Sequence, residues 1–501
     1  MYRILQGLNM YSEDRIKKYY NRYKKISRKM INSENYNKAI YAMRHASSLM
    51  HLFNFILYDN EMEEMLSEVG LKVLGDFAPV EEGEAIVLYD SIAIDNMALS
   101  YQYLVALSKM KIPLYYITYS DKFATNGCKL KKLACSSENC HLIEINRTDD
   151  YINDMKHIKE IIVDIKPSKI LLHMSNSDVV GTAVFSNIKC TRLYINHGDD
   201  QFWLGMCALD YIIEFRGMGL DTSLKYRNAW KKQCLINPYY PIIDNTKFAG
   251  FEFKVPDRAV KLFSGGRFVK VYSENGKFLD VVKDILLNNE SAFFIFAGSG
   301  DKAPMLKYIY DNGLEDRWKV IDYRKDLYGV MKNVDIYLGT YPQSGGLMTQ
   351  YAVAAGTPIV EMDTKNGGVA EDLLKNTYEI RITMTEWTEY FDLVAKLIDD
   401  SEYRREFSDK LRQSVYTQED FEHNLKQIIS ENTSEVSCVM RDNNVKLRAE
   451  RLLEAENKYL HRVSGMMCNK LFFKYYPLTT LKCILEYIKN NSTKKYEGDS
   501  L

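Results

Sequence analysis

The chain has 501 residues, a length that predicts two or three domains at about 100 to 200 residues per domain. Its 66 Lys and Arg residues nearly balance its 67 Asp and Glu residues, so a charged ligand has to be held by local groups. No uncharged apolar stretch reaches the roughly 18 residues of a membrane span, and the nine cysteines lack the spacing of a disulfide framework. We therefore expect a cytoplasmic protein with reduced thiols and no nucleic-acid partner.

Residues 1–75 show helical periodicity and no strand pattern. Helices are expected at 14–30, 37–57 and 61–69, and we interpret this region as a helical N-terminal extension. From residue 84 onward, short apolar runs alternate with amphipathic segments. The expected strands are 85–89, 113–118, 169–173, 192–196 and 210–215. Strands separated by helices form a parallel sheet covered on both faces, so residues 76–245 are predicted to be a Rossmann-like lobe.

A local cluster of cysteines, Cys128, Cys135 and Cys140 with His141, lies within this first lobe. The cluster lacks the short Cys-x-x-Cys spacing that is typical of a zinc site. We interpret it as a lysine-rich surface loop and predict no metal site.

A second alternation of strands and helices follows residues 236–256, which carry three prolines and little periodicity and are interpreted as a linker. Its expected strands are 261–263, 293–297, 318–322, 334–338 and 358–361. Residues 246–425 are therefore predicted to be a second doubly wound lobe, and residues 426–501 to be helices that pack back on the lobes. Two such lobes leave a cleft between the carboxyl ends of their strands, where ligands of open α/β sheets bind.

The segment from Leu338 to Gly346 is the strongest candidate for ligand binding. A predicted strand runs into a loop whose Ser344, Gly345 and Gly346 open a helix. The free N–H groups of a helix start bind phosphate, and glycines let a diphosphate approach the backbone closely. The alternative interpretation is an ordinary turn between a strand and a helix.

The order of a strand, Pro-x-x-Gly-Gly, a helix ending in Ala-x-Gly-Thr-Pro-Ile-Val and a final strand resembles the signature of GT-B glycosyltransferases of the family 4-like group. It resembles the O-GlcNAc transferase and HMW1C-like group more loosely. The likeness covers residues 261–361 and implies two Rossmann-like lobes, with a nucleotide-diphosphate sugar on the second. It places the donor phosphates at Gly345, Gly346 and Thr349.

The resemblance departs from the family at the position that holds the donor ribose. Many relatives carry an acidic residue on this helix, and the matching residue here is Tyr351. Glu361, after the next strand, is a candidate replacement, although a helix cap or a solvated side chain explains it equally well. The resemblance also places Gly298 and Tyr323 beside the nucleotide.

A second motif, Phe263-Ser-Gly-Gly-Arg-Phe-Val-Lys270, opens the second lobe. Breaking a sugar–phosphate bond leaves negative charge on the nucleotide, and this charge requires nearby cations. In the GT-B pattern a Gly-Arg turn and a following lysine supply them. Arg267 is therefore the first candidate and Lys270 or Lys277 the second, while the alternative is a set of surface basic residues in a turn.

A third motif, Asn196-His-Gly-Asp-Asp200, follows a predicted strand of the first lobe and places His197 at the edge of the cleft. A neutral histidine accepts a proton from an attacking hydroxyl. Asp199 or Asp200 could orient this histidine, bind sugar hydroxyls or act as the base instead. A purely structural histidine is the alternative. Polar residues after neighbouring strands are weaker candidates for acceptor binding, with ordinary loop polarity as the alternative: Asp90, Ser91, Ser175, Asn176 and Asp178.

These motifs predict a metal-independent glycosyltransferase without a cofactor. The enzyme would move a hexosyl or N-acetylhexosaminyl group from a nucleotide-diphosphate sugar, with a UDP-sugar favoured, to a hydroxyl of a glycan, lipid-linked or protein acceptor. One alternative is a non-catalytic GT-B module that binds a partner transferase or glycan, which Tyr351 favours. A sugar-nucleotide epimerase is a third hypothesis, and a partner protein or a homo-oligomer stays open.

The run from Lys470 to Ile488 mixes aromatic and apolar residues with lysines. A helix that packs across the lobes and a helix that lies on a membrane surface both have this composition. We favour the packing helix and keep a peripheral contact with the inner face of the membrane as the alternative.

Overall fold

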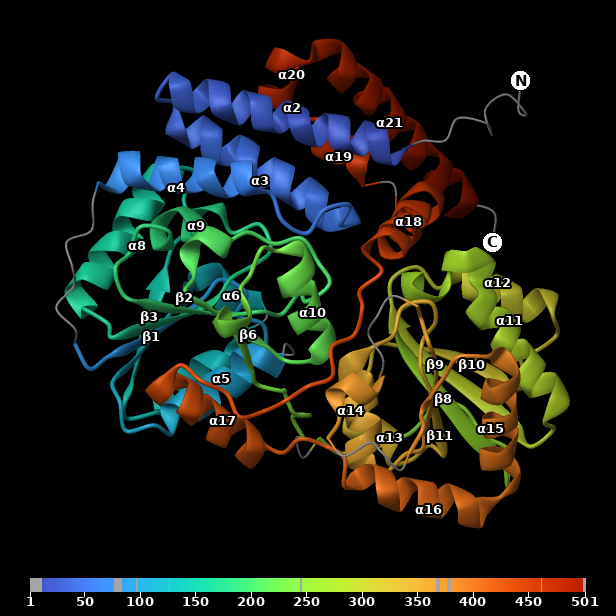
Figure 1. Ribbon diagram of the computed structural model, residues 1–501. Helices are drawn as coiled ribbons and strands as arrows, with labels where there is room; N and C mark the ends of the chain where they lie inside the picture. Colours follow the sequence, from blue (N-terminus) through green and yellow to red (C-terminus); the bar gives the residue numbers. More distant parts are fainter. Residues whose placement is uncertain are drawn as a thin grey trace.

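The computed structural model describes residues 11–75, 83–95, 98–125, 127–243, 246–365, 370–375, 380–460 and 462–498. Two lobes, each built on a parallel sheet, lie beneath a helical cap that is formed by both ends of the chain (Figure 1). This arrangement confirms the predicted α/β fold with two doubly wound lobes.

The first lobe contains a seven-stranded parallel sheet in the order β3-β2-β1-β4-β5-β6-β7. The strands are β1 (Ile86–Asp90), β2 (Leu114–Tyr119), β3 (Cys140–Ile145), β4 (Lys169–His173), β5 (Thr191–Ile195), β6 (Tyr211–Glu214) and β7 (Cys234–Ile236). The helices are α5 (Ala98–Ser108), α6 (Ser120–Thr125), α7 (Cys128–Ser136), α8 (Tyr151–Ile165), α9 (Val179–Phe185) and α10 (Gly217–Tyr226). The strand order reverses between β1 and β4, which creates a switch point where open sheets bind ligands.

The interpretation of the cysteine cluster as a surface loop is wrong. Its residues form α7 and the edge strand β3, which pairs with β2. Leu130 and Ala134 of α7 are buried in the core on one face of the sheet. The lysines that suggested a loop occupy the solvent side of this amphipathic helix.

The second lobe contains a six-stranded parallel sheet in the order β10-β9-β8-β11-β12-β13. The strands are β8 (Val260–Arg267), β9 (Ala292–Ser299), β10 (Trp318–Asp322), β11 (Ile336–Leu338), β12 (Ile359–Met362) and β13 (Thr383–Met384). The helices are α11 (Ser273–Asn288), α12 (Ala303–Asp311), α13 (Leu327–Met331), α14 (Gly346–Ala355), α15 (Trp387–Asp399) and α16 (Ser401–Arg412). The continuous apolar run of β9 is buried on both faces, as expected for a central parallel strand.

The N-terminal helices share a core with the first lobe. They are α2 (Glu13–Asn32), α3 (Tyr36–Phe53) and α4 (Asn60–Leu74). The inward face of α2, with Ile16, Tyr23 and Met30, joins the same apolar cluster as Ile170 and Leu172 of β4. Residues 11–75 are therefore packed as part of this lobe.

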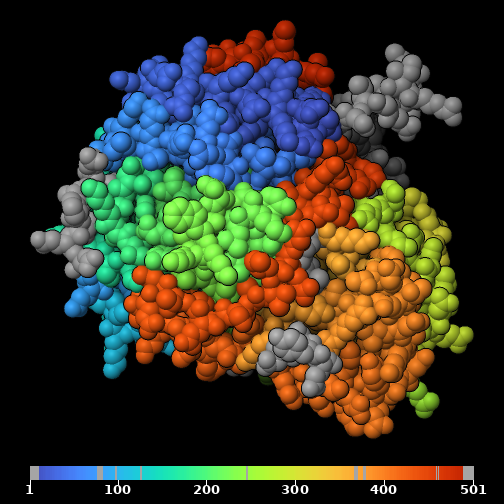
Figure 2. All heavy atoms as spheres, in the orientation of Figure 1, coloured from blue at the N-terminus to red at the C-terminus, as the bar shows by residue number. Residues whose placement is uncertain are grey.

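The C-terminal helices connect all parts of the molecule. They are α17 (Gln418–Glu431), α18 (Val445–Ala455), α19 (Val463–Met467), α20 (Lys470–Tyr475) and α21 (Pro477–Gly498). The predicted boundary at residue 425 falls inside α17, which packs on α5 of the first lobe. The segment from α17 to α18 then runs along the boundary between the lobes (Figure 2), and α19 to α21 pack on the N-terminal helices. None of the helices in the described ranges is long and apolar enough to cross a membrane.

Candidate active site between the lobes

The second lobe contributes the first turn of α14, whose N-cap is Gly345. The Lys270 ammonium donates a hydrogen bond to the Ser344 carbonyl at 3.2 Å, and a Cβ added to Gly345 would lie 3.7 Å from this ammonium. A Cβ added to Gly346 would lie 2.8 Å from the hydroxyl of Tyr239, which follows β7, so the lobes meet here. A lysine charge beside the N–H groups of a helix start forms a site for an anion.

The three predicted cations separate into two groups. Burial, and then the nearby charge of Arg267, lowers the pKa of Lys270 to about 8, which places both cations in one electrostatic environment. Arg267 is exposed at the end of β8. The ammonium of Lys277 lies instead over the ring of Trp387, 5.4 Å from its centroid, and no contact in the described part of the chain links it to the start of α14.

The remaining residues predicted for the nucleotide are spread over this edge of the sheet. The Thr349 hydroxyl points inward and donates a hydrogen bond to Glu361 at 2.6 Å. Gly298 lies so close to the neighbouring strand that an added Cβ would be 2.4 Å from the Gly266 carbonyl oxygen. Tyr323 is exposed after β10. The structure thus places Gly298 beside Gly266, which precedes Arg267, and leaves Tyr323 exposed after β10.

Glu361 is buried at the end of β12, so its interpretation as a solvated side chain is wrong. Burial raises the pKa of this carboxyl to about 7, against the lowering effects of the Thr349 hydrogen bond and of the charges of Arg216 and Lys270. Arg216 belongs to the first lobe and Lys270 to the second, so positive charges from both lobes act on the Glu361 carboxyl.

Tyr351, which replaces the expected acid on α14, points toward the linker. Its hydroxyl donates a hydrogen bond to the Ile242 carbonyl at 3.0 Å. The side chain therefore ties α14 to the chain segment that joins the lobes.

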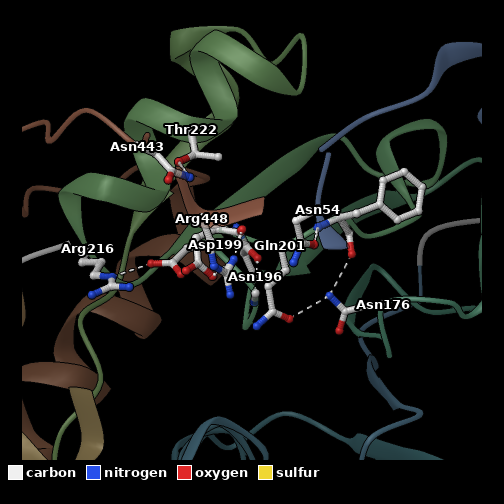
Figure 3. Close-up of polar contacts among 12 residues, drawn as sticks. Asn54, Asn176, Asn196, Asp199, Gln201, Arg216, Thr222, Asn443 and Arg448 are labelled. Atoms are coloured by element: carbon white, nitrogen blue, oxygen red, sulfur yellow. Dashed lines mark hydrogen bonds and ion pairs between the residues drawn. The ribbon is translucent and has the colours of Figure 1, made fainter. Parts of the chain in front are cut away.

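The first lobe contributes His197, directly after β5. The Asn176 amide nitrogen donates hydrogen bonds to the Phe202 carbonyl at 3.0 Å and to Gln201 at 3.3 Å (Figure 3). Its oxygen therefore faces His197. That oxygen lies 2.9 Å from Nε2 of His197 and can only accept a hydrogen bond. The imidazole proton is thereby assigned to Nε2, and the lone pair to Nδ1, which has no hydrogen-bond partner in the described part of the chain.

The environment keeps the imidazole of His197 neutral. Burial, followed by the electrostatic effects of His173 and His51, lowers its pKa to about 3. His173 packs edge-on against His197 with ring centroids 5.3 Å apart, and its own Nδ1 lies 3.0 Å from the buried carboxylate of Asp90. Asp90 and Asn176, predicted as acceptor contacts, thus position the two histidines.

The two aspartates after His197 are each paired with an arginine. The Asp199 carboxylate accepts a hydrogen bond from Arg216, as Figure 3 shows, and Asp200 forms an ion pair with Arg448 of α18 at 2.9 Å. Burial raises the pKa of Asp200, while the charge of Arg448 opposes the rise. The structure shows neither aspartate in a hydrogen bond with His197, so the predicted orienting role passes to Asn176.

Buried polar contacts also fix the loop that carries His197. The Arg227 guanidinium donates hydrogen bonds to the carbonyls of Gly198, Asp199 and Gln201. It also lies 4.9 Å from the ring centroid of Trp203. Several hydrogen bonds from one buried guanidinium to successive carbonyls hold this loop in one arrangement.

Three charged or titratable residues of the interlobe site were missed in the sequence. Arg216 lies at the carboxyl end of β6, and this position after a predicted strand is a signal that could have found it. His51 in the last turn of α3 and Arg448 of α18 lie outside both sheets, where strand patterns give no such signal. Burial, and then the charges of Arg448, Arg462 and Arg267, lowers the pKa of His51 to about 4, so His51 feels cations from the cap and from the second lobe.

Comparisons with known proteins give a family match for the second lobe and a likeness in fold for both lobes. Residues 250–414 match the family model described as glycosyl transferases group 1. No curated protein matches the chain in sequence.

Solved structures of several glycosyltransferases have a similar fold. HepE of Anabaena, in complex with UDP and glucose, is 12% identical with a TM-score of 0.52, over 70% of this chain and 100% of that chain. A mutant O-GlcNAc transferase of Thermobaculum terrenum is 14% identical with a TM-score of 0.50, over 87% of this chain and 85% of that chain. A glycosyltransferase of Rickettsia africae is 12% identical with a TM-score of 0.51, over 70% of this chain and 100% of that chain.

These matches confirm the predicted likeness to GT-B glycosyltransferases. The family model covers the lobe that carries the helix start and the Lys270 ammonium, and the fold comparison extends to both lobes. The chain has the GT-B fold, its second lobe matches the glycosyl transferases group 1 model, and the protein is a glycosyltransferase.

Proposed function

We propose that this glycosyltransferase moves a hexosyl or N-acetylhexosaminyl group from a UDP-sugar to a hydroxyl of a glycan, lipid-linked or protein acceptor. The observation that carries the proposal is the pairing of two unlike groups where the lobes meet. The helix start beside Lys270 and Arg267 offers positive charge, and His197 offers a neutral, buried nitrogen whose lone pair has no hydrogen-bond partner in the described part of the chain. His51 lies within electrostatic range of both groups. The charge of Arg267 lowers the pKa of His51, and the charge of His51 lowers the pKa of His197.

The choice of UDP rests on the solved relatives. HepE of Anabaena has been crystallised with UDP and with UDP-glucose. In this chain the diphosphate would lie against Gly345 and Gly346, with Lys270 and Arg267 on its oxygens. No metal or cofactor enters the proposed step, because these cations and the helix start supply the positive charge that the leaving group needs.

The proposed step forms a bond between the acceptor hydroxyl oxygen and the anomeric carbon of the sugar. The bond from that carbon to the β-phosphate oxygen breaks, and its electron pair stays on the phosphate. The hydroxyl proton goes to Nδ1 of His197. The negative charge of a bound donor opposes the effects that lower the pKa of His197, and so brings this base closer to the range in which proton transfer is efficient.

Binding of UDP to paired lysine variants tests the donor site. Replacing Lys270 by Met removes a charge-assisted contact of about 1.5–3 kcal/mol, so we expect the dissociation constant of UDP to rise about 10- to 100-fold. Lys277→Met is the matched control, because its ammonium lies over Trp387, and it should leave UDP binding unchanged. Isothermal titration of both variants and thermal shift with UDP, GDP, ADP and CDP provide the readouts.

Two outcomes would contradict the proposal. Equal UDP affinity in Lys270→Met and the unmodified protein would remove Lys270 from the donor site. Stabilisation by none of the four nucleotides would favour the alternative of a non-catalytic module that binds a partner transferase or glycan.

A further inference from the structure

The outward face of α21 carries a stripe of exposed apolar side chains. Leu478 is 82% exposed, Leu481 48% and Leu485 69%. Their spacing of i, i+3 and i+7 places them on one side of the helix. Phe473 of α20 is exposed beside the start of this stripe. Several large apolar side chains in one row on a surface mark a site of interaction.

The opposite face of α21 fixes this orientation. Glu486 forms an ion pair with Arg15 of α2 at 2.9 Å, and Thr479 accepts a hydrogen bond from Arg22 of α2 at 2.7 Å. Cys483, on the same side, is fully buried. These contacts seat one face of α21 on α2. The apolar stripe is therefore not the surface through which α21 packs on α2.

The charges around the stripe are positive. Lys474 and Lys482 are exposed on α20 and α21, and the ammonium of Lys29 of α2 lies 5.0 Å from the ring centroid of Tyr475. Glu486 is the sole carboxylate among the described side chains of α20 and α21, and Arg15 neutralises it. An apolar row flanked by lysines is complementary to an anionic lipid surface.

We propose that α20 and α21 are a membrane-docking surface for bilayers that contain anionic lipids. The leucines of the stripe and Phe473 would enter the boundary between headgroups and acyl chains, while Lys474 and Lys482 would contact the lipid phosphates. Figure 1 shows α20 and α21 at the outer margin of the helical cap. This inference concerns a surface outside the interlobe site and does not depend on the proposed donor or acceptor.

Co-sedimentation of the full chain with vesicles tests this surface. We expect binding to vesicles of equal parts phosphatidylcholine and phosphatidylglycerol, weaker binding at high salt, and little binding to phosphatidylcholine alone. Leu478→Asp combined with Leu485→Asp should weaken binding about tenfold or more. Leu287→Asp, at a leucine of α11 that is 63% exposed, is the matched control and should bind like the unmodified protein.

Three results would overturn the proposal. These are no binding to anionic vesicles, binding that survives the double substitution, and conversion of a self-associated protein into a monomer by the double substitution without any vesicle. The last would identify the occupant as a second copy of the chain. UDP binding without vesicles, measured on the same variants, should be unchanged, which separates this test from that of the donor site.

Discussion

The two halves of the interlobe site are built in opposite ways. On the second lobe, Arg267 and Lys270 have no carboxylate partner in the described ranges, and Lys270 lies at the start of α14. On the first lobe nearly every charge is already matched, as Asp199 is by Arg216 and Asp200 by Arg448. The difference teaches that the second lobe is prepared for a charged ligand, because it offers uncompensated charge. On the first lobe the paired charges leave a hydrogen-bonded frame and one buried nitrogen, Nδ1 of His197, without a partner in the described residues, which is consistent with the proposed uncharged hydroxyl acceptor.

Removing the unpartnered Nδ1 of His197 should have the largest effect on activity. His197→Gln keeps a donor for the Asn176 oxygen but supplies no basic nitrogen. We expect kcat to fall by about 10²- to 10⁴-fold, the usual contribution of a positioned general base, with UDP affinity little changed. Steady-state transfer and UDP titration measure the two quantities separately.

A matched histidine shows whether the loss belongs to the site. His45→Gln changes a different half-buried histidine, which belongs to α3 and packs between Tyr23 and Tyr41. This substitution should leave kcat unchanged. A fall in UDP affinity without a fall in kcat for His197→Gln would mean that the first lobe also binds the charged donor.

Changing the partner of His197 should have a smaller, pH-dependent effect. In the unmodified protein the pKa of His197 is lowered to about 3, so the ring is neutral through the physiological range and gives no acidic limb there. In Asn176→Asp a carboxylate would accept from Nε2, favour the charged ring and raise that pKa. Protonation blocks the base, so activity should fall as pH decreases through the raised pKa and recover at higher pH.

The pH profile of kcat/KM over about pH 5 to 9 measures this limb. Asn176→Ala is the control, because it also removes the hydrogen bond to Phe202 but adds no charge, and it should lower activity without a new acidic limb. Profiles of the same shape for both variants would show that Asn176 does not set the protonation of His197.

The same contrast explains what could be predicted from the sequence. The helix start at Gly345 and Gly346 could be predicted because a strand, a loop and a helix are adjacent in the chain and the proposed phosphate-binding groups belong to the backbone. The residue types at 270 and 267 follow the same local pattern. Lys277 obeys the pattern equally well, but its side chain lies on Trp387, a residue far along the chain that the local pattern does not include.

The first-lobe half depends on contacts between distant segments. His197 could be predicted because it follows a predicted strand, and a neighbouring aspartate was one of the open possibilities for its partner. The structure supplies Asn176 from the loop after β4 instead, and pairs Asp200 with Arg448, 248 residues away in sequence. Side chains that meet only after folding leave no periodic signal, so His51 and Arg448 could not be inferred from patterns within the two lobes.

Removing the hydroxyl of Tyr351 should have the smallest effect, and it tests whether this side chain contributes to nucleotide binding. Tyr351→Phe deletes the hydrogen bond to Ile242, so we expect the free energy of unfolding to fall by about 1 kcal/mol with UDP affinity unchanged. Tyr337→Phe is the control, because the buried hydroxyl of Tyr337 has no hydrogen-bond partner in the described chain and its removal should not destabilise the fold. Denaturant unfolding and UDP titration measure both. Weaker UDP binding by Tyr351→Phe alone would show that this tyrosine takes the place of the acidic ribose contact, and that side chains as well as backbone select the nucleotide.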